Sequence, residues 1–199
     1  MQQQQRRIIG ITGRPGIGKT TLALTIARSV SSTGCSVGGF ITPEVREGGV
    51  RRGFIIKSLD KDITLTLATT EPTPGALRVG RYYVNADAGR EASELLNASL
   101  RSYDVIVVDE VGPMELGLRE LRAAIERLLL NNSKPVIATF YYRLNEVYPR
   151  LYSLLTQGIT IYLNEGNRYE YLRRASELAR WLIGEACGNK GGEGLTLHT

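Results

Sequence analysis

An eight-residue segment near the start of the chain has the residue types that bind the phosphates of a nucleotide. It fits the pattern G-x-x-x-x-G-K-[ST] as Gly13-Arg14-Pro15-Gly16-Ile17-Gly18-Lys19-Thr20. Its glycines let successive backbone N–H groups turn toward one anion, and a helix beginning at Lys19 directs the positive end of its dipole at the same point. We therefore predict that these residues and Thr21 bind nucleotide, with Lys19 bridging the β- and γ-phosphates and the Thr20 hydroxyl coordinating Mg²⁺.

Two carboxylates that follow an apolar run complete the chemistry of such a site. The run Val105-Ile106-Val107-Val108 leads directly into Asp109 and Glu110. In phosphate-loop NTPases an acid at such a strand end holds Mg²⁺ through water, and a following glutamate can polarise the attacking water. We predict that Asp109 shares the metal with Thr20 and that Glu110 is the general base. The alternative for Glu110 is a surface carboxylate in the loop after the strand.

The glycine that follows these acids, Gly112, makes the segment a D-x-x-G pattern. GTPases use this pattern to place a backbone amide near the γ-phosphate, so Gly112 joins the predicted nucleotide-binding residues. Guanine specificity also needs an N-K-x-D segment after a later strand, and the nearest match, Asn189-Lys190-Gly191-Gly192, lacks the aspartate and lies in the C-terminal tail. A dedicated GTPase is therefore disfavoured.

Arginines gather around Gly48-Gly49, which separates two β-branched arms and is typical of a β-hairpin. A guanidinium that reaches the γ-phosphate would stabilise the charge of the transition state, and Arg46 and Arg51 are our catalytic candidates for that role. The alternative is that these charges solvate the hairpin and protect its edge. Asn167 and Arg168, at the start of a later helix, are candidates to contact base or ribose, or else cap that helix.

The elements that must position these residues follow from the hydrophobic periodicity. Strands are expected at 7–12, 36–42, 63–68, 81–85, 104–109, 135–139 and 159–163, and helices at 20–31, 88–100, 114–130, 145–155 and 167–185. The later strands are continuously apolar, which suits parallel strands that are covered on both faces. We predict an α/β three-layer sandwich formed by one domain over residues 1–187, with a mostly β insertion at about 36–85 and a flexible Gly-rich tail at 188–199.

Composition excludes several other classes. The 199 residues carry 25 Lys and Arg against 20 Asp and Glu, a formal charge of +5, and no apolar run reaches the length of a membrane helix, so we expect a cytoplasmic protein without membrane contact. The one histidine, His198, lies in the tail, which excludes a Ser-His-Asp or Cys-His pair. Cys35 and Cys187 are far apart in sequence and outside any metal-binding spacing, so we expect packing residues and no disulfide framework.

Several further segments resemble the small nucleoside-triphosphatase family found in thermophilic microbes and in vertebrates. The resemblance includes 39–46 with Gly48-Gly49, Arg51 and Gly53-Phe54, then 78–84, the segment 108–112 with Met114-Glu115-Leu116, and Asn167-Arg168. It implies a RecA-like sheet in a monomer that hydrolyses NTPs to NDP and phosphate slowly, with Mg²⁺ and with little base discrimination. The chain departs from the family pattern at Pro43, where an acid is often found, and in residues 140–143, to which we assign no role.

Two other functions are compatible with the same residues. The first is a phosphotransferase acting on a nucleoside, a cofactor or a nucleic-acid 5′-hydroxyl, because a carboxylate can deprotonate an alcohol as well as water. The second is a nucleotide-gated nucleic-acid binder, which the small excess of positive charge supports only weakly. The sequence does not reveal the physiological substrate or the base preference.

Overall fold

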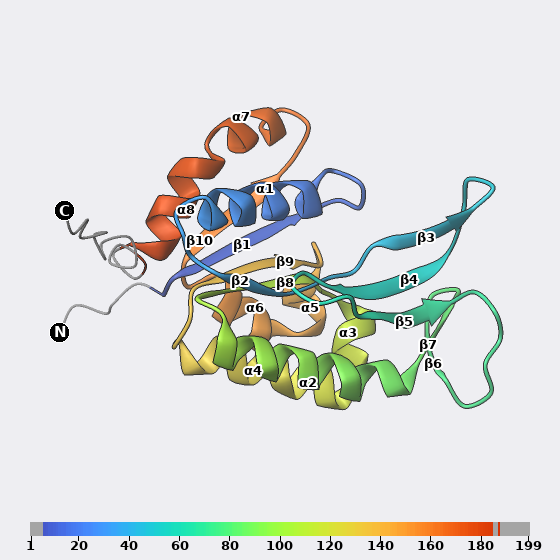
Figure 1. Cartoon of the computed structure of the whole chain (residues 1–199). Coiled ribbons are helices and arrows are strands. Elements are labelled where there is room, and N and C mark those ends of the chain that lie inside the picture. Colours follow the sequence, from blue (N-terminus) through green and yellow to red (C-terminus); the bar gives the residue numbers. More distant parts are fainter. Residues whose placement is uncertain (1–5, 185–186, 188–199) are drawn as a thin grey trace, which may run out of the picture.

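The computed structural model describes residues 6–184 and residue 187. The predicted tail at 188–199, His198 and the segment 189–192 lie outside the described residues. Figure 1 shows a twisted sheet with helices on both faces and with strands that project beyond the helical layers at one end. These projecting strands and the adjoining edge of the core contain most of the residues predicted to do chemistry.

Five parallel strands form the core of the sheet. In chain order they are β1 (Ile8–Gly13), β2 (Val37–Ile41), β8 (Val105–Val111), β9 (Val136–Phe140) and β10 (Ile159–Leu163), and in space they run β10-β1-β9-β8-β2. All four neighbouring pairs are parallel. Strands β8 and β9 are apolar and buried along almost their whole length because helices cover both faces of the sheet. The carboxyl ends of β1, β8 and β9 therefore meet at one edge.

The helices form two layers around this sheet (Figure 1). On one face α1 (Lys19–Ser31) packs with α7 (Arg168–Arg173) and α8 (Ala175–Ile183), and their apolar residues join the side chains of β1 and β10 in one buried cluster. On the other face α2 (Ala86–Ser102), α4 (Arg119–Asn131) and α6 (Pro149–Leu155) cover the sheet through a second cluster. The predicted α/β three-layer sandwich is confirmed, with a parallel core that agrees with the RecA-like sheet expected from the family resemblance.

The insertion is a set of antiparallel strands that extends the same sheet beyond β2. It comprises β3 (Glu44–Glu47), β4 (Val50–Ser58), β5 (Thr64–Thr69), β6 (Leu77–Val79) and β7 (Tyr82–Val84). The β3–β4 pair is the predicted hairpin, and it turns at Gly48-Gly49. The insertion begins at Glu44 instead of near residue 36, because β2 pairs in parallel with β8 and so belongs to the core.

Three predicted helices are each divided in two. The segment expected at 114–130 forms α3 (Pro113–Gly117) and α4, separated by Leu118 in an extended conformation. The segment expected at 145–155 forms α5 (Leu144–Val147) and α6, because the residue before Pro149 is kept out of the helical region. The segment expected at 167–185 divides at Arg174 into α7 and α8. Among residues 6–184 and 187, no helix has the length and apolar character needed to cross a bilayer.

The expectation that the two cysteines only pack in the core is wrong, because they form a disulfide. Cys35 follows α1 and Cys187 follows α8, and their Cα atoms lie 5.6 Å apart although the residues are separated by 152 positions in the sequence. The packing of α1 against α8 brings them together. Spacing along the chain contains no signal for such a contact. The disulfide lies beyond the C-terminal end of α1, whereas the phosphate loop precedes the N-terminal end of this helix.

Candidate functional site

The predicted phosphate loop connects β1 to α1 at the carboxyl edge of the parallel core. Gly13 has a φ of 154°, and a Cβ atom at this position would lie 2.5 Å from the carbonyl oxygen of Leu163 in β10. Gly18 is the N-cap residue of α1 in the left-handed region, with a φ of 108°. Glycine is the residue that tolerates both conformations, so the loop can turn sharply from β1 into the start of α1, where the N–H groups of the first helical turn can face an anion.

A hydroxyl–carboxylate network links this loop to the acidic strand β8. The Thr20 hydroxyl donates to the Asp109 carboxylate, at 3.1 Å from Oδ1 and 2.9 Å from Oδ2. Thr139 on β9 donates to the same carboxylate, and the Thr42 hydroxyl donates to the Asp109 carbonyl oxygen at 2.7 Å. Burial raises the pKa of Asp109, and the hydrogen bonds from Thr139 and Thr20 partly oppose this rise. Asp109 is therefore fixed beside the first turn of α1, as predicted for a metal residue.

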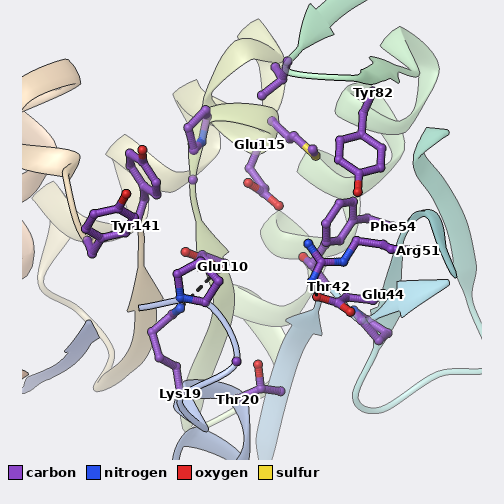
Figure 2. A pocket seen from close by; sticks show the side chains of 18 of the residues that line it. Lys19, Thr20, Thr42, Glu44, Arg51, Phe54, Tyr82, Glu110, Glu115 and Tyr141 are labelled. Atoms are coloured by element: carbon purple, nitrogen blue, oxygen red, sulfur yellow. Dashed lines mark ion pairs between the residues drawn. The ribbon is translucent and has the colours of Figure 1, made fainter. Parts of the chain in front are cut away.

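Lys19 and Glu110 form the second link between the loop and β8. Lys19 is buried, donates to the Gly13 carbonyl oxygen at 3.3 Å and lies 3.9 Å from Glu110 Oε2 (Figure 2). Glu110 lies within β8, at an irregularity between Val108 and Val111, and not in the loop after the strand. Its side chain is about one-third exposed. Burial raises the pKa of Glu110, the nearby charge of Lys19 opposes this rise, and the charge of Asp109 adds to it. A raised pKa suits a general base near neutral pH.

A cleft of about 610 Å³ extends from the phosphate loop to the insertion. Figure 2 shows Lys19, Thr20 and Glu110 at one end, Arg51, Phe54 and Tyr82 at the other, and Tyr141 on the opposite wall. The lining residues are Pro15, Gly16, Gly18, Lys19, Thr20, Thr21, Thr42, Pro43, Glu44, Arg51, Phe54, Val79, Gly80, Tyr82, Glu110, Gly112, Pro113, Met114, Glu115, Tyr141 and Tyr142. The cleft thus combines most of the predicted loop residues with Glu110, Gly112 and one of the two arginine candidates.

The structure separates the two arginine candidates. Arg51 lines the cleft, pairs with Glu44 and lies over the Phe54 ring at 5.6 Å. Arg46 is its cross-strand partner in the hairpin, but it contacts the other oxygen of Glu44 at 2.7 Å and donates to the Gly49 carbonyl oxygen at 2.9 Å. Arg46 is not among the residues that line the cleft. The site therefore has a guanidinium at its insertion side, and Arg51 supplies it.

The remaining predicted residues lie around the loop without lining the cleft. Gly13, Arg14 and Ile17 belong to the loop backbone, where the Ile17 N–H donates to the Arg14 carbonyl oxygen at 3.3 Å. Asn167 contacts backbone groups near the connection between β10 and α7: its side chain donates to the Tyr162 carbonyl oxygen and accepts from the Asn164 N–H. Arg168 lies over the Tyr169 ring and donates to its hydroxyl group. Because this connection follows β10, the neighbour of β1, it lies at the same sheet edge as the loop.

Sequence reasoning missed three residues of the site. Thr139 is the next-to-last residue of the apolar strand β9, so its position beside Asp109 depends on the order of β8 and β9. Glu44 lies in a segment that carries only the family resemblance, yet it contacts both arginine candidates. Glu115 in α3 is 4% exposed and lines the cleft, and burial together with Glu110 raises its pKa to about 8. A signal for Glu115 was the occurrence of an acid in an otherwise apolar segment just after the acidic pair.

The parallel core, the glycine loop at the start of α1 and the acidic strand facing it define a phosphate-loop nucleotide-binding protein. Comparison with known proteins narrows the class further. A family model described as NTPase matches residues 8–175, and the chain belongs to this NTPase family.

Curated relatives and solved structures agree with this assignment. The Nucleoside-triphosphatase THEP1 of Saccharolobus solfataricus is 36% identical over 81% of this chain and 89% of its own length. The Nucleoside-triphosphatase THEP1 of Pyrococcus abyssi is 37% identical over 90% of this chain and 97% of its own length. The crystal structure of THEP1 from the hyperthermophile Aquifex aeolicus has a TM-score of 0.71 at 31% identity, covering 86% of this chain and 98% of that one. The solution structure of a human cancer-related nucleoside triphosphatase has a TM-score of 0.65 at 29% identity, and the match covers 84% of this chain and 94% of that one. These names do not favour the phosphotransferase alternative.

Proposed function

We propose that the protein hydrolyses nucleoside triphosphates to nucleoside diphosphate and phosphate, with Mg²⁺ and with little discrimination between bases. The observation that carries this proposal is the joining of the phosphate loop to β8 through two contacts, Thr20 with Asp109 and Lys19 with Glu110. The names of the relatives, which are those of nucleoside-triphosphatases, support it.

The residues of the chain divide the chemistry among them. The loop N–H groups and the N-terminus of α1 bind the phosphates, and Lys19 lies between the β- and γ-phosphates, where negative charge grows as the bond between them breaks. Glu110 takes the proton of the attacking water as its oxygen bonds to the γ-phosphorus. Arg51 faces the same space from the insertion and stabilises the charge on the γ-phosphate oxygens.

The donor set beside the loop fits a hard divalent cation. Thr20 and Asp109 offer only oxygen atoms, and these are already within hydrogen-bond distance of one another. Among the described residues, no group of three or more His, Cys, Asp and Glu side chains is arranged to hold a metal. This agrees with Mg²⁺, which keeps several waters and phosphate oxygens as ligands. Thr20 and Asp109 would hold it, and the ion would neutralise charge on the β- and γ-phosphate oxygens.

Low base discrimination is supported by the contacts of Asn167 and Arg168, the two residues predicted to contact base or ribose. The side chain of Asn167 is engaged with backbone groups of its own connection, and the Arg168 guanidinium is engaged with Tyr169. Base selection requires free hydrogen-bonding groups directed at the edge of the base. The groups of these two residues that contact the protein are not free for that, so different bases are expected to be accepted with similar efficiency.

Phosphate release from ATP, GTP, CTP and UTP, each with Mg²⁺ and with a chelator, tests the proposal. We expect release from all four with Mg²⁺ and loss of release with the chelator. Single-stranded RNA added to a parallel set tests for stimulation by nucleic acid. Release from one nucleotide alone would contradict the broad base range, and Mg²⁺-independent release would contradict the assigned metal residues.

A further inference from the structure

The cleft is larger than a triphosphate and an attacking water require. Lys19 and Glu110 define the γ-phosphate end of the bound nucleotide, because Lys19 contacts the β- and γ-phosphates in such sites. The cleft continues from Glu110 toward the insertion, so it lies on the side from which a nucleophile approaches. A hydrolase needs only water there. The remaining space, which we call the insertion end, is lined by Arg51, Phe54, Tyr82, Met114 and Glu115.

The walls of the insertion end suit a flat aromatic ring. Phe54 on β4 and Tyr82 on β7 contact each other edge to face, with ring centroids 5.1 Å apart. Tyr141 and Tyr142, which both line the cleft, form a second edge-to-face pair with ring centroids 4.8 Å apart. Figure 2 shows Tyr141 on the opposite wall. The two pairs come from distant parts of the chain and face one cleft. Clefts of several hundred Å³ with aromatic walls and few polar groups are the usual form of sites for small organic ligands.

Glu115 is the polar group best placed to orient such a ligand. Figure 2 shows its carboxyl group directed into the cleft between the two aromatic walls. Only 4% of the residue is exposed. Burial and the nearby Glu110 raise its pKa to about 8, against hydrogen bonds from its own N–H and that of Gly112. Near neutral pH the group is therefore mainly a carboxylic acid, with one O–H donor and remaining acceptor capacity.

The charge at the insertion end favours an uncharged ligand. Arg51 pairs with Glu44 here and with phosphate oxygens in the proposed reaction, and Glu115 is neutral when protonated, so neither Arg51 nor Glu115 has a free charge for a second ligand. The Nε atom of Arg51 is buried without a hydrogen-bond partner among the residues that the structure describes.

We propose that the insertion end of the cleft binds a second ligand, an uncharged heteroaromatic molecule of nucleoside size whose ring edge pairs with the Glu115 carboxylic acid. The proposal rests on the proposed function in one respect, since the triphosphate must occupy the loop end. The ligand then lies between the two aromatic pairs. A carboxylic acid and the edge of a nucleobase each present a donor beside an acceptor, so they can form two hydrogen bonds at once.

Equilibrium dialysis with labelled adenosine, guanosine, cytidine and uridine tests this site. The protein is first saturated with Mg²⁺ and a non-hydrolysable ATP analogue, so that the nucleosides cannot bind at the phosphate loop. We expect saturable binding of at least one nucleoside at one equivalent per chain. Absence of saturable binding for all four, or binding that disappears when the analogue is present, would overturn the proposal.

Two variants at one position separate recognition by a neutral acid from other roles of Glu115. Glu115→Leu removes the hydrogen-bonding edge and is expected to weaken nucleoside binding at least about tenfold, the effect of one lost hydrogen bond in a buried site. Glu115→Gln keeps a donor and an acceptor and is expected to bind nucleoside within about threefold of the wild type. Equal binding by both variants, or equal losses in both, would overturn the assignment.

Phosphate release without nucleoside, measured on the same preparations, keeps the two proposals apart. A protein that binds nucleoside but releases no phosphate contradicts the proposed hydrolysis and leaves the second site supported. A protein that releases phosphate but binds no nucleoside contradicts the second site alone. Circular dichroism and the melting temperature of each variant show whether a loss of binding reflects unfolding.

Discussion

The two sides of the cleft differ in how firmly their polar groups are held. On the core side, Asp109 is almost fully buried, accepts hydrogen bonds from Thr20 and Thr139, and lies between parallel strands packed on both faces. On the insertion side, Arg46 and Arg51 lie in a hairpin where β3 pairs only with β4, and both guanidinium groups contact Glu44, whose side chain is about one-third exposed. Exposed ion pairs of this kind contribute little to stability.

This difference assigns different tasks to the two sides. A buried network of hydrogen bonds holds its groups before the substrate arrives, so the core side is organised for binding and proton transfer. An arginine paired with a surface carboxylate can exchange that partner for a phosphate oxygen at small cost. The insertion side is therefore suited to respond to the substrate. The predictions below test this contrast, beginning with the largest expected effect.

Removing the proposed base should cause the largest loss of turnover. Glu110→Gln keeps the shape of the side chain but cannot accept a proton, so we expect kcat to fall about 10²–10⁴-fold. The KM for ATP should change far less than kcat, because the phosphate loop and the Lys19 side chain are retained although Lys19 loses its ion pair with Glu110. Steady-state phosphate release and nucleotide binding by calorimetry measure both quantities. Full turnover in Glu110→Gln together with loss of activity in Lys19→Ala would show that another group accepts the proton.

The disulfide provides the second test, since it fixes the core and not the insertion. Cys35 and Cys187 are separated by 152 positions in the chain, so their bond restricts the unfolded state strongly. The Cys35→Ser, Cys187→Ser double variant should lose about 2–5 kcal/mol in the free energy of unfolding. Phosphate release at moderate temperature should be unchanged, because the cysteines lie at the far end of α1 from the loop. If the oxidised wild type and the double variant had the same unfolding midpoint, the disulfide would not form in solution.

Glu115 provides the third test through the pH dependence of stability. Its pKa is raised to about 8 in the fold, so the native state binds a proton that the unfolded chain releases near the ordinary glutamate pKa of 4.5. Stability from this group is complete below the unfolded pKa and is lost as pH rises toward about 8. Relative to Glu115→Gln, the wild type should lose at least ~2 kcal/mol between about pH 5 and about pH 8. Urea unfolding at several pH values measures the free energy of unfolding of both proteins. If this free energy varied with pH in the same way in the wild type and in Glu115→Gln, a buried protonated acid would be contradicted.

Local patterns were sufficient for one side of the cleft and insufficient for the other. The phosphate loop and the acidic strand could be predicted because glycine spacing, the start of α1 and the apolar run of β8 each depend on neighbouring residues. The position of Thr139 depends on strand order, and the Cys35–Cys187 bond depends on the packing of α1 against α8. Neither has a local signal. Arg46 and Arg51 could not be ranked for the same reason: their sequence context is alike, and only the hairpin's place beside the cleft separates them.

The smallest and most discriminating effect is expected from these two arginines. Arg51 lines the cleft, so Arg51→Ala should lower kcat about 10- to 100-fold, less than the loss of a fully preorganised arginine finger because Glu44 must release it first. Arg46 contacts Glu44 and the Gly49 carbonyl oxygen outside the cleft, so Arg46→Ala should leave kcat within about threefold. Phosphate release at saturating ATP compares the two variants directly.

The matched control is Arg51→Lys, which keeps the charge but not the planar fork. If Arg51 acts through bidentate contact with phosphate oxygens, lysine should recover only a small part of the lost rate. If it acts only through its positive charge, lysine should recover most of the rate. Losses of similar size in Arg46→Ala and Arg51→Ala would show that the hairpin acts as a unit. In that case, the paired arginines would be holding Glu44 and the hairpin in place, and the contrast between the two sides would be one of stability and not of chemistry.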